Sequence, residues 1–141
     1  MAKTVEQALE AAVPAIGAVR SKKYLDIIHL PMHQIGAKFE GTFAPFISTE
    51  AEVPEFVDDH WDETRPDWVG SSVTLDTYRE VVRDENKAAF LIEASRYAPD
   101  GSLMQTFEAI LTVEKRDVDR RLISRSPFNV RMAKVDYFSR P

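Results

Sequence analysis

The 141-residue chain contains no cysteine, so it forms no disulfide, no thiolate zinc site and no thiol nucleophile. Its five glycines are few, which argues against a glycine-rich phosphate-binding loop. No apolar run reaches the roughly 18–20 residues that a membrane helix needs. The N-terminus has polar and acidic residues where a signal peptide would have its apolar core. We therefore expect a cytoplasmic protein that does not contact a membrane.

The residues that are present describe an ordinary soluble domain, with 44% apolar and 29% charged residues. This length predicts a single domain over residues 1–141. The net charge of −5 argues against a nucleic-acid partner. Residues 48–63 carry seven acids and no base, whereas residues 115–141 carry eight bases against three acids. This asymmetry either steers a ligand or pairs two segments, or it marks two solvated surfaces.

The first part of the chain has the pattern of helices. Thr4 and Gln7 have the spacing of a capping box, and the apolar residues that follow share one helical face. Pro14 interrupts this run, so we expect a kink or a break there. Ser21 begins a second helical stretch, which we expect to close near His29 because Pro31 disfavours helix for the residue before it.

A hairpin and a third helix are expected next. Residues 33–39 and 42–47 are short extended runs around a glycine-containing turn, which is typical of a hairpin. Thr49 and Glu52 form a second capping-box pattern, at the start of an acidic helix that we expect to end at residues 65–67.

The second half of the sequence is rich in strands. We expect strands at 68–82, 87–98, 103–115 and 120–128, joined by turns at 84–86, 99–101 and 117–119. The Pro-Asp-Gly turn is the clearest hairpin signal of the chain. Helices followed by a meander of antiparallel strands predict an α+β domain with the helices on one face of a curved sheet. We expect residues 129–141 to form a tail or an additional edge strand.

This order of elements resembles the nuclear transport factor 2-like superfamily (SnoaL-like, ketosteroid-isomerase-like) over residues 4–128. The resemblance rests on four segments of this sequence: 29–31 (His-Leu-Pro), 88–92 (Ala-Ala-Phe-Leu-Ile), 96–101 (Arg-Tyr-Ala-Pro-Asp-Gly) and 121–123 (Arg-Leu-Ile). One departure is Arg120, which stands where many members have a tryptophan.

The resemblance implies a cone-shaped barrel, formed by a curved, mostly antiparallel sheet with N-terminal helices over its concave face. It also implies a deep pocket between sheet and helices, and a homodimer formed through the outer face of the sheet. It does not imply one function, because members include isomerases, dehydratases, cyclases, hydrolases and non-catalytic binding proteins.

Two histidines are the first catalytic candidates. In isomerase-like members the general base lies on the first hairpin, which here makes His33 and Glu40 the candidates. Glu40 precedes a glycine and is better explained as a turn residue, so we expect His33 to act as base, with His29 or Asp26 assisting. The alternative is that His29 ends a helix and bonds a backbone carbonyl.

Two carboxylates are also candidates, because Glu93 and Glu108 each interrupt an apolar strand. A three-residue loop at 99–101 would place them on opposite faces of the sheet, one toward the pocket and the other outward. The alternative is a salt bridge to Arg96, to Arg125 or to a partner chain.

Several further residues are candidates for contact with a ligand. Arg125 lies between two serines in the last strand and is suited to an anionic ligand, although we favour the alternative that it faces solvent or an interface. The aromatic candidates for the core and the pocket wall are Trp61, Phe90 and Phe107.

No metal site is expected. Pro31 prevents His29 and His33 from sharing a helical face, and His60 with Asp58 or Asp59 would form a ligand set only by chance of folding. We also expect no cofactor.

Together these features predict a protein that binds a small apolar molecule in a pocket. Its activity would be cofactor-independent isomerisation, dehydration or cyclisation by general acid–base proton transfer. The alternative is a non-catalytic member that senses a ligand or binds a partner protein.

Overall fold

The computed structural model describes residues 4–18, 25–34, 36–38, 41–43, 46–52 and 69–133. One helix, α1 (Val5–Ala18), precedes a six-stranded sheet with the order β4-β1-β8-β7-β6-β5. Its central strands are β6 (Lys87–Tyr97), β7 (Leu103–Arg116) and β8 (Asp119–Met132), and β5 (Ser72–Arg83) forms one edge. The sheet is open, because within the described residues its two edge strands do not pair with each other.

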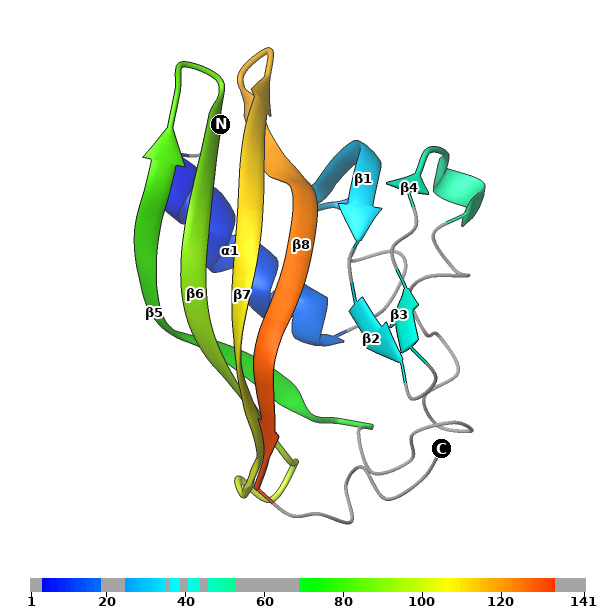
Figure 1. Ribbon diagram of the computed structural model, residues 1–141, viewed down its shortest axis with the longest axis vertical. Helices are drawn as coiled ribbons and strands as arrows, with labels where there is room; N and C mark the ends of the chain where they lie inside the picture. The colour runs from blue at the N-terminus through cyan, green and yellow to red at the C-terminus, as the bar shows by residue number, and fades with distance from the viewer. Residues whose placement is uncertain are drawn as a thin grey trace.

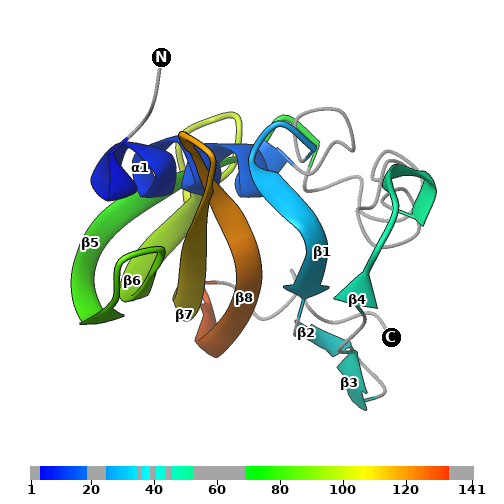
Figure 2. The ribbon, with the colours of Figure 1, turned by 90° about the horizontal axis from the view of Figure 1, so that it is seen from above.

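Helix α1 begins with the predicted capping box. The Thr4 backbone N–H donates to Gln7 Oε1 (2.9 Å), and the Gln7 backbone N–H donates to Thr4 Oγ1 (3.1 Å). The helix continues through Pro14 to Ala18, so the break that was one of the two expectations for Pro14 does not occur. One face of α1 is buried against the sheet, chiefly against β5 and β8, through Ala8, Leu9, Ala12 and Val13. Figures 1 and 2 show α1 lying across the concave side of the curved sheet.

The long strands follow the predicted meander, and each hairpin turn is stabilised locally. Asp84 Oδ1 accepts hydrogen bonds from the backbone N–H groups of Asn86 (2.8 Å) and Lys87 (2.7 Å). Asp100 Oδ1 accepts one from the backbone of Ser102 (2.9 Å), and Gly101 has φ of 90°, which favours glycine. The predicted α+β class and the meander of long strands are therefore confirmed, with one N-terminal helix, α1, on the sheet among the described residues.

The predicted end of the second helical stretch, near His29, is wrong. Strand β1 (Ile28–Gln34) occupies this segment and pairs in parallel with β8, with Ile28 opposite Leu122. Ile28 and Met32 are buried in the hydrophobic core. Burial of alternate residues beside β8 stabilises a strand here, which outweighs the helical propensity of the segment. Residues 21–24 lie outside the described residues.

The predicted hairpin is present but shorter. Strands β2 (Gly36–Lys38) and β3 (Gly41–Phe43) pair antiparallel, whereas β4 (Phe46–Ile47) returns to pair with β1. His33 therefore lies in the main sheet and not in the hairpin.

The second capping-box pattern and the C-terminal end of the sheet complete the comparison. One bond of the predicted box forms, from the Thr49 backbone N–H to Glu52 Oε1 (3.1 Å), at a short 3-10 helix, Glu50–Glu52, whereas the Glu52 backbone N–H donates to the Thr49 carbonyl oxygen (3.2 Å). The rest of the predicted acidic helix, with Trp61, lies outside the described residues. At the C-terminal end β8 continues to Met132, so the tail predicted from residue 129 begins inside a strand.

Candidate functional site

The strand pairing separates the side chains of the sheet into two faces. Ala94 lies opposite Leu75 on one side and Phe107 on the other, and Leu111 lies opposite Arg125. The face that these residues share is the concave one, because it also carries the buried core residues Phe90, Ile92, Ala109 and Leu122.

Arg96 is a charged residue on this buried face. It occupies the same alternate positions of β6 as Phe90, Ile92 and Ala94, and its side chain is only 5% exposed. Its Nη1 donates to Ser71 Oγ (2.7 Å). Its neighbour across the pair, Gln105, is also only 5% exposed. A guanidinium and an amide are thus placed side by side in an environment where neither is well hydrated.

Arg125 reaches the same face from β8. Its Nε is buried and has no hydrogen-bond partner among the described residues. Burial lowers the pKa of Arg96 to about 10, and the positive charge of Arg125 contributes to the same shift. Arg96 stays protonated at neutral pH, so two cations repel each other across the concave face.

Aromatic and aliphatic side chains surround these cations. Phe107 is half-buried on the concave face and packs against the core. Phe90 is 1% exposed and meets Tyr78 edge-to-face, with ring centroids 5.8 Å apart. Phe90 therefore lies in the core and Phe107 packs against it, while a role of either ring in a pocket wall stays a prediction. The arrangement offers positive charge beside apolar surface.

The predicted catalytic residues lie elsewhere in the sheet. His29 Nε2 is 3.0 Å from the backbone oxygen of Asp119, which matches the bond to a carbonyl considered as the alternative, although His29 lies in a strand and not at a helix end. His33 is half-buried in β1, opposite Ser124 of β8 and Phe46 of β4. Asp26 is exposed in the turn before β1. No hydrogen bond joins Asp26 to either histidine within the described residues, so the catalytic roles stay predictions.

The register predicted for Glu93 and Glu108 is wrong. Tyr97 lies opposite Leu103 as expected, but Arg96 lies opposite Gln105, which leaves Met104 as an extra residue. Met104 is fully buried, and its burial accounts for the bulge. The one-residue shift places Glu93 directly opposite Glu108 on the outer face.

The two carboxylates accordingly do not contact the arginines of the concave face. Glu108 accepts a hydrogen bond from Asn129 Nδ2 (3.2 Å), and Glu93 is exposed. Neither forms an ion pair with Arg96 or Arg125 in the described part of the chain.

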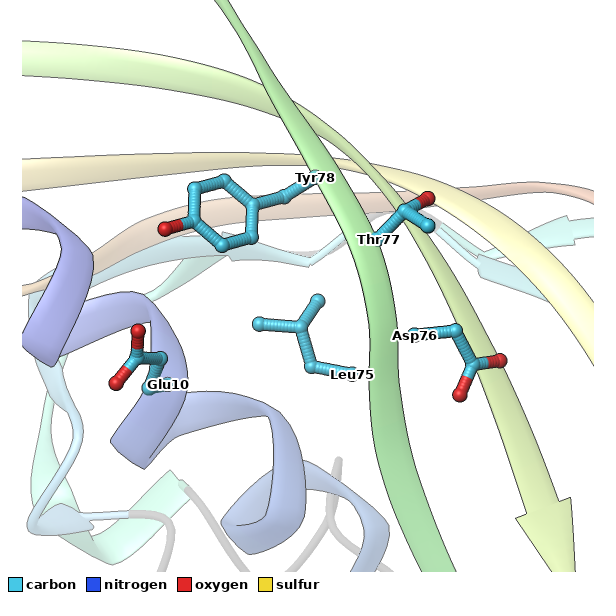
Figure 3. Close-up of a pocket in the computed structure, with 5 residues that line it drawn as sticks. All are labelled: Glu10, Leu75, Asp76, Thr77 and Tyr78. Atoms are coloured by element: carbon cyan, nitrogen blue, oxygen red, sulfur yellow. The ribbon is translucent and has the colours of Figure 1, made fainter.

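A separate hollow lies between α1 and the edge strand β5, with a volume of about 450 Å³. Figure 3 shows Glu10 projecting from α1, while Leu75 and Tyr78 lie on the helix side of β5 and Asp76 and Thr77 on its other side. Glu10 and Tyr78 are exposed, so this hollow is a surface groove and not a deep pocket. None of the residues predicted as catalytic or ligand-binding lines it.

Within the described ranges, no group of three or more histidine, aspartate and glutamate side chains is placed to hold a metal ion. The candidate ligands His60, Asp58 and Asp59 lie outside these ranges. Among the helices that the structure describes, none is both long and apolar enough to cross a membrane.

Arg96 is the site residue that the sequence reasoning missed. It was considered only as a partner for Glu93 or Glu108. Its position at an even number in the run Ala88, Phe90, Ile92 and Ala94 was a signal that it shares the buried face of its strand.

Comparison with known proteins identifies the fold. No family model matches the sequence, and no curated protein matches it. A protein of unknown function with a cystatin-like fold from Nostoc punctiforme superposes with a TM-score of 0.67 at 14% identity, covering 96% of this chain and 98% of the other. A nuclear transport factor 2-like protein with a cystatin-like fold from Novosphingobium aromaticivorans gives 0.63 at 9% identity, covering 87% and 77%.

A third structure from the same organism, provisionally described as an aromatic ring hydroxylase, gives a TM-score of 0.61 at 11% identity, covering 94% of this chain and 92% of the other. These neighbours have different descriptions and share little sequence, so they show a common architecture and no common activity. The chain has the nuclear transport factor 2-like, cystatin-like α+β fold.

Proposed function

We propose that this protein binds a small molecule on the concave face of its sheet. The observation that carries this proposal is the pair Arg96 and Gln105, two polar residues that are each 5% exposed on the face that also carries the buried apolar core. Both side chains carry N–H groups that can donate hydrogen bonds, and they lie among apolar residues. A few polar groups on an apolar surface are typical of sites that orient a small ligand.

The chemistry of these groups favours binding over catalysis. Guanidinium and amide groups orient a ligand, but they do not exchange protons near neutral pH. The structure places no carboxylate of the described residues beside them. We therefore favour the ligand-binding, non-catalytic alternative for this site.

The experiment is a fragment titration of the full-length, isotope-labelled protein followed by NMR. We expect apolar fragments to shift the side-chain signals of Gln105 and the Nε–Hε signal of Arg96, and to leave the amides of Glu93 and Glu108 on the outer face unchanged. Shifts confined to the outer face, or to the groove at Glu10 and Tyr78, would contradict the proposal.

A proton-transfer enzyme is the second candidate, and one observation favours it. His33 is half-buried and lies beside Ser124, while the next residue, Gln34, lies beside Arg125. The base would then be His33, assisted by His29 or Asp26. His33→Ala should abolish turnover of an identified substrate and leave the thermal unfolding temperature unchanged, whereas retained turnover would exclude His33 as the base.

We also propose that the protein is a homodimer formed through the outer face of the sheet. Phe128 on this face is 50% exposed, and Val82 is 62% exposed. Burial of such side chains between two copies would be favourable. Sedimentation equilibrium should give twice the chain mass, and Phe128→Asp should yield a monomer; a wild-type monomer would overturn the proposal.

A further inference from the structure

The groove between α1 and the edge strand β5 has a volume of about 450 Å³, which is within the range of sites that hold small molecules. Leu75 and Tyr78 from β5 and Glu10 from α1 line the space between the two elements (Figure 3). We propose that this groove binds an organic cation, an ammonium group carried on a small apolar body. The groove is separate from the site proposed above, because neither Arg96 nor Gln105 is among the residues that line it.

A β-bulge in β5 creates the apolar floor of the groove. The register of β5 against β6 changes directly after Leu75, where Asp76 is an extra residue. Residues three positions apart in a regular strand lie on opposite faces, but the extra residue brings Leu75 and Tyr78 to the same side, toward the helix (Figure 3). Asp76 lies on the other side of β5, where its carboxylate accepts hydrogen bonds from Thr74 Oγ1 (2.7 Å) and from Ser95 Oγ.

Tyr78 offers an aromatic surface whose position is fixed by the core. Its ring meets the buried ring of Phe90 edge-to-face, with the centroids 5.8 Å apart. Tyr78 is nevertheless 41% exposed, so part of its side chain is accessible from the groove. The face of a tyrosine ring attracts a cation, and its hydroxyl can accept a hydrogen bond.

Glu10 supplies the negative charge of the groove. Its side chain projects from α1 into the space between the helix and β5 (Figure 3). Arg83, which reaches α1 from β5, pairs with Glu6 (3.1 Å) and Glu80 (2.6 Å). No ion pair joins Glu10 to another of the described residues. Its carboxylate can therefore accept hydrogen bonds from an ammonium group without first losing a partner in this part of the chain.

This combination of residues selects the chemical class of the ligand. The carboxylate of Glu10 attracts a cation and repels an anion. Leu75 and the ring of Tyr78 provide apolar surface against which a short hydrocarbon or aromatic body can pack. A metal ion fits less well, because within the described residues no three carboxylate or imidazole groups are placed to hold one.

The test compares benzylamine, whose amine is protonated at neutral pH, with benzyl alcohol, which has the same ring and no charge, by NMR titration of the full-length protein. We expect benzylamine to bind at least about threefold more tightly, because cation–π contacts and ion pairs at exposed sites contribute modestly. The ring signals of Tyr78 should shift with benzylamine. Glu10→Gln should abolish the preference. Glu85→Gln, which removes the same charge from an exposed turn outside the groove, is the matched control and should retain it.

Three results would overturn the proposal. Equal affinity for the two probes, or a preference retained in Glu10→Gln, would overturn the assignment of an organic cation. A preference lost equally in Glu85→Gln would show that the probe responds to the net negative charge of the protein and not to the groove. Shifts at Gln105 with none at Tyr78 would overturn the groove as a site and leave the function proposed above in place.

Discussion

The two faces of one sheet place opposite charges in opposite environments. Arg96 and Arg125 point into the concave side with Phe90 and Phe107, whereas Glu93 and Glu108 face outward. Arg96 lies three positions after Glu93 in the same strand, and because side chains alternate between the two faces, this odd offset places one side chain inward and the other outward. The comparison teaches that charged residues in an apolar strand have to be assigned to a face before they are assigned a role.

The largest expected effect is a difference in stability between truncations on the two faces of the sheet. Phe90→Ala removes a ring that is 1% exposed, and we expect it to lower the free energy of unfolding by about 3–5 kcal/mol. Phe128→Ala on the outer face, where the ring is 50% exposed, should cost less than about 1 kcal/mol in the monomer. Urea denaturation of both variants measures the difference. Equal losses would show that the outer face is as closely packed as the concave one.

A smaller effect is expected for the charges of the concave face. Without ligand, Arg125→Met should raise the free energy of unfolding by about 1 kcal/mol, because it removes a partly buried cation that repels Arg96 and has no counter-ion among the residues that the structure describes. Arg131→Met in the exposed part of the same strand should leave it unchanged. A loss of stability in Arg125→Met, measured by urea denaturation, would show that a partner compensates its charge.

On the outer face the facing carboxylates should respond to a change of sign. Glu93→Lys replaces a like-charge pair by an opposite-charge pair across the strands, which we expect to stabilise the fold by about 0.5 kcal/mol at low salt. Glu85→Lys in the neighbouring turn has no facing carboxylate in the sheet and serves as control. The gain should shrink in 1 M salt, and a salt-independent gain would exclude an electrostatic cause.

The smallest expected effect is on the pH dependence of stability, through the carboxylate of Asp84, which accepts backbone hydrogen bonds. Hydrogen bonds from the backbone of Lys87 and then of Asn86 lower the pKa of Asp84. A carboxylate with a lowered pKa adds stability above its unfolded-state pKa of about 3.9, and this stability is lost as the pH falls through the folded-state value. Asp84→Ala should therefore weaken the decrease of stability in acid, as urea midpoints between pH 6 and pH 3 would show. An identical pH profile in Asp84→Ala would mean that this turn contributes nothing to the acid response.

Several elements could be predicted from local sequence because their stabilising contacts are local. The capping box at Thr4, the bond between Thr49 and Glu52, and the turns at 84–86 and 99–101 depend on residues two or three positions apart. The strands between the turns follow from their apolar content. The site residues stay predictions: the structure places Phe90, Phe107 and Arg125 on the concave face, and the sequence did not mark Arg96 as a ligand-binding candidate.

Two predictions from the sequence are wrong, the helix end at β1 and the register of β6 with β7, and both depend on contacts that the local sequence does not show. Strand β1 was taken for the end of a helix because the parallel pairing with β8, about 90 residues away, leaves no local signal. The register between β6 and β7 shifted by one residue because Met104 is buried, and this moved Glu108 to the same side as Glu93.

The sequence by itself therefore determined the α+β class, the order of the long strands, their turns and the start of α1, all of which rest on local hydrogen bonds and on the spacing of apolar residues. Only the tertiary structure decided which way each charge faces, because one extra residue in a strand reverses the face of every residue beyond it. The same packing brought Arg96 and Arg125, from strands that are not neighbours, to one concave surface.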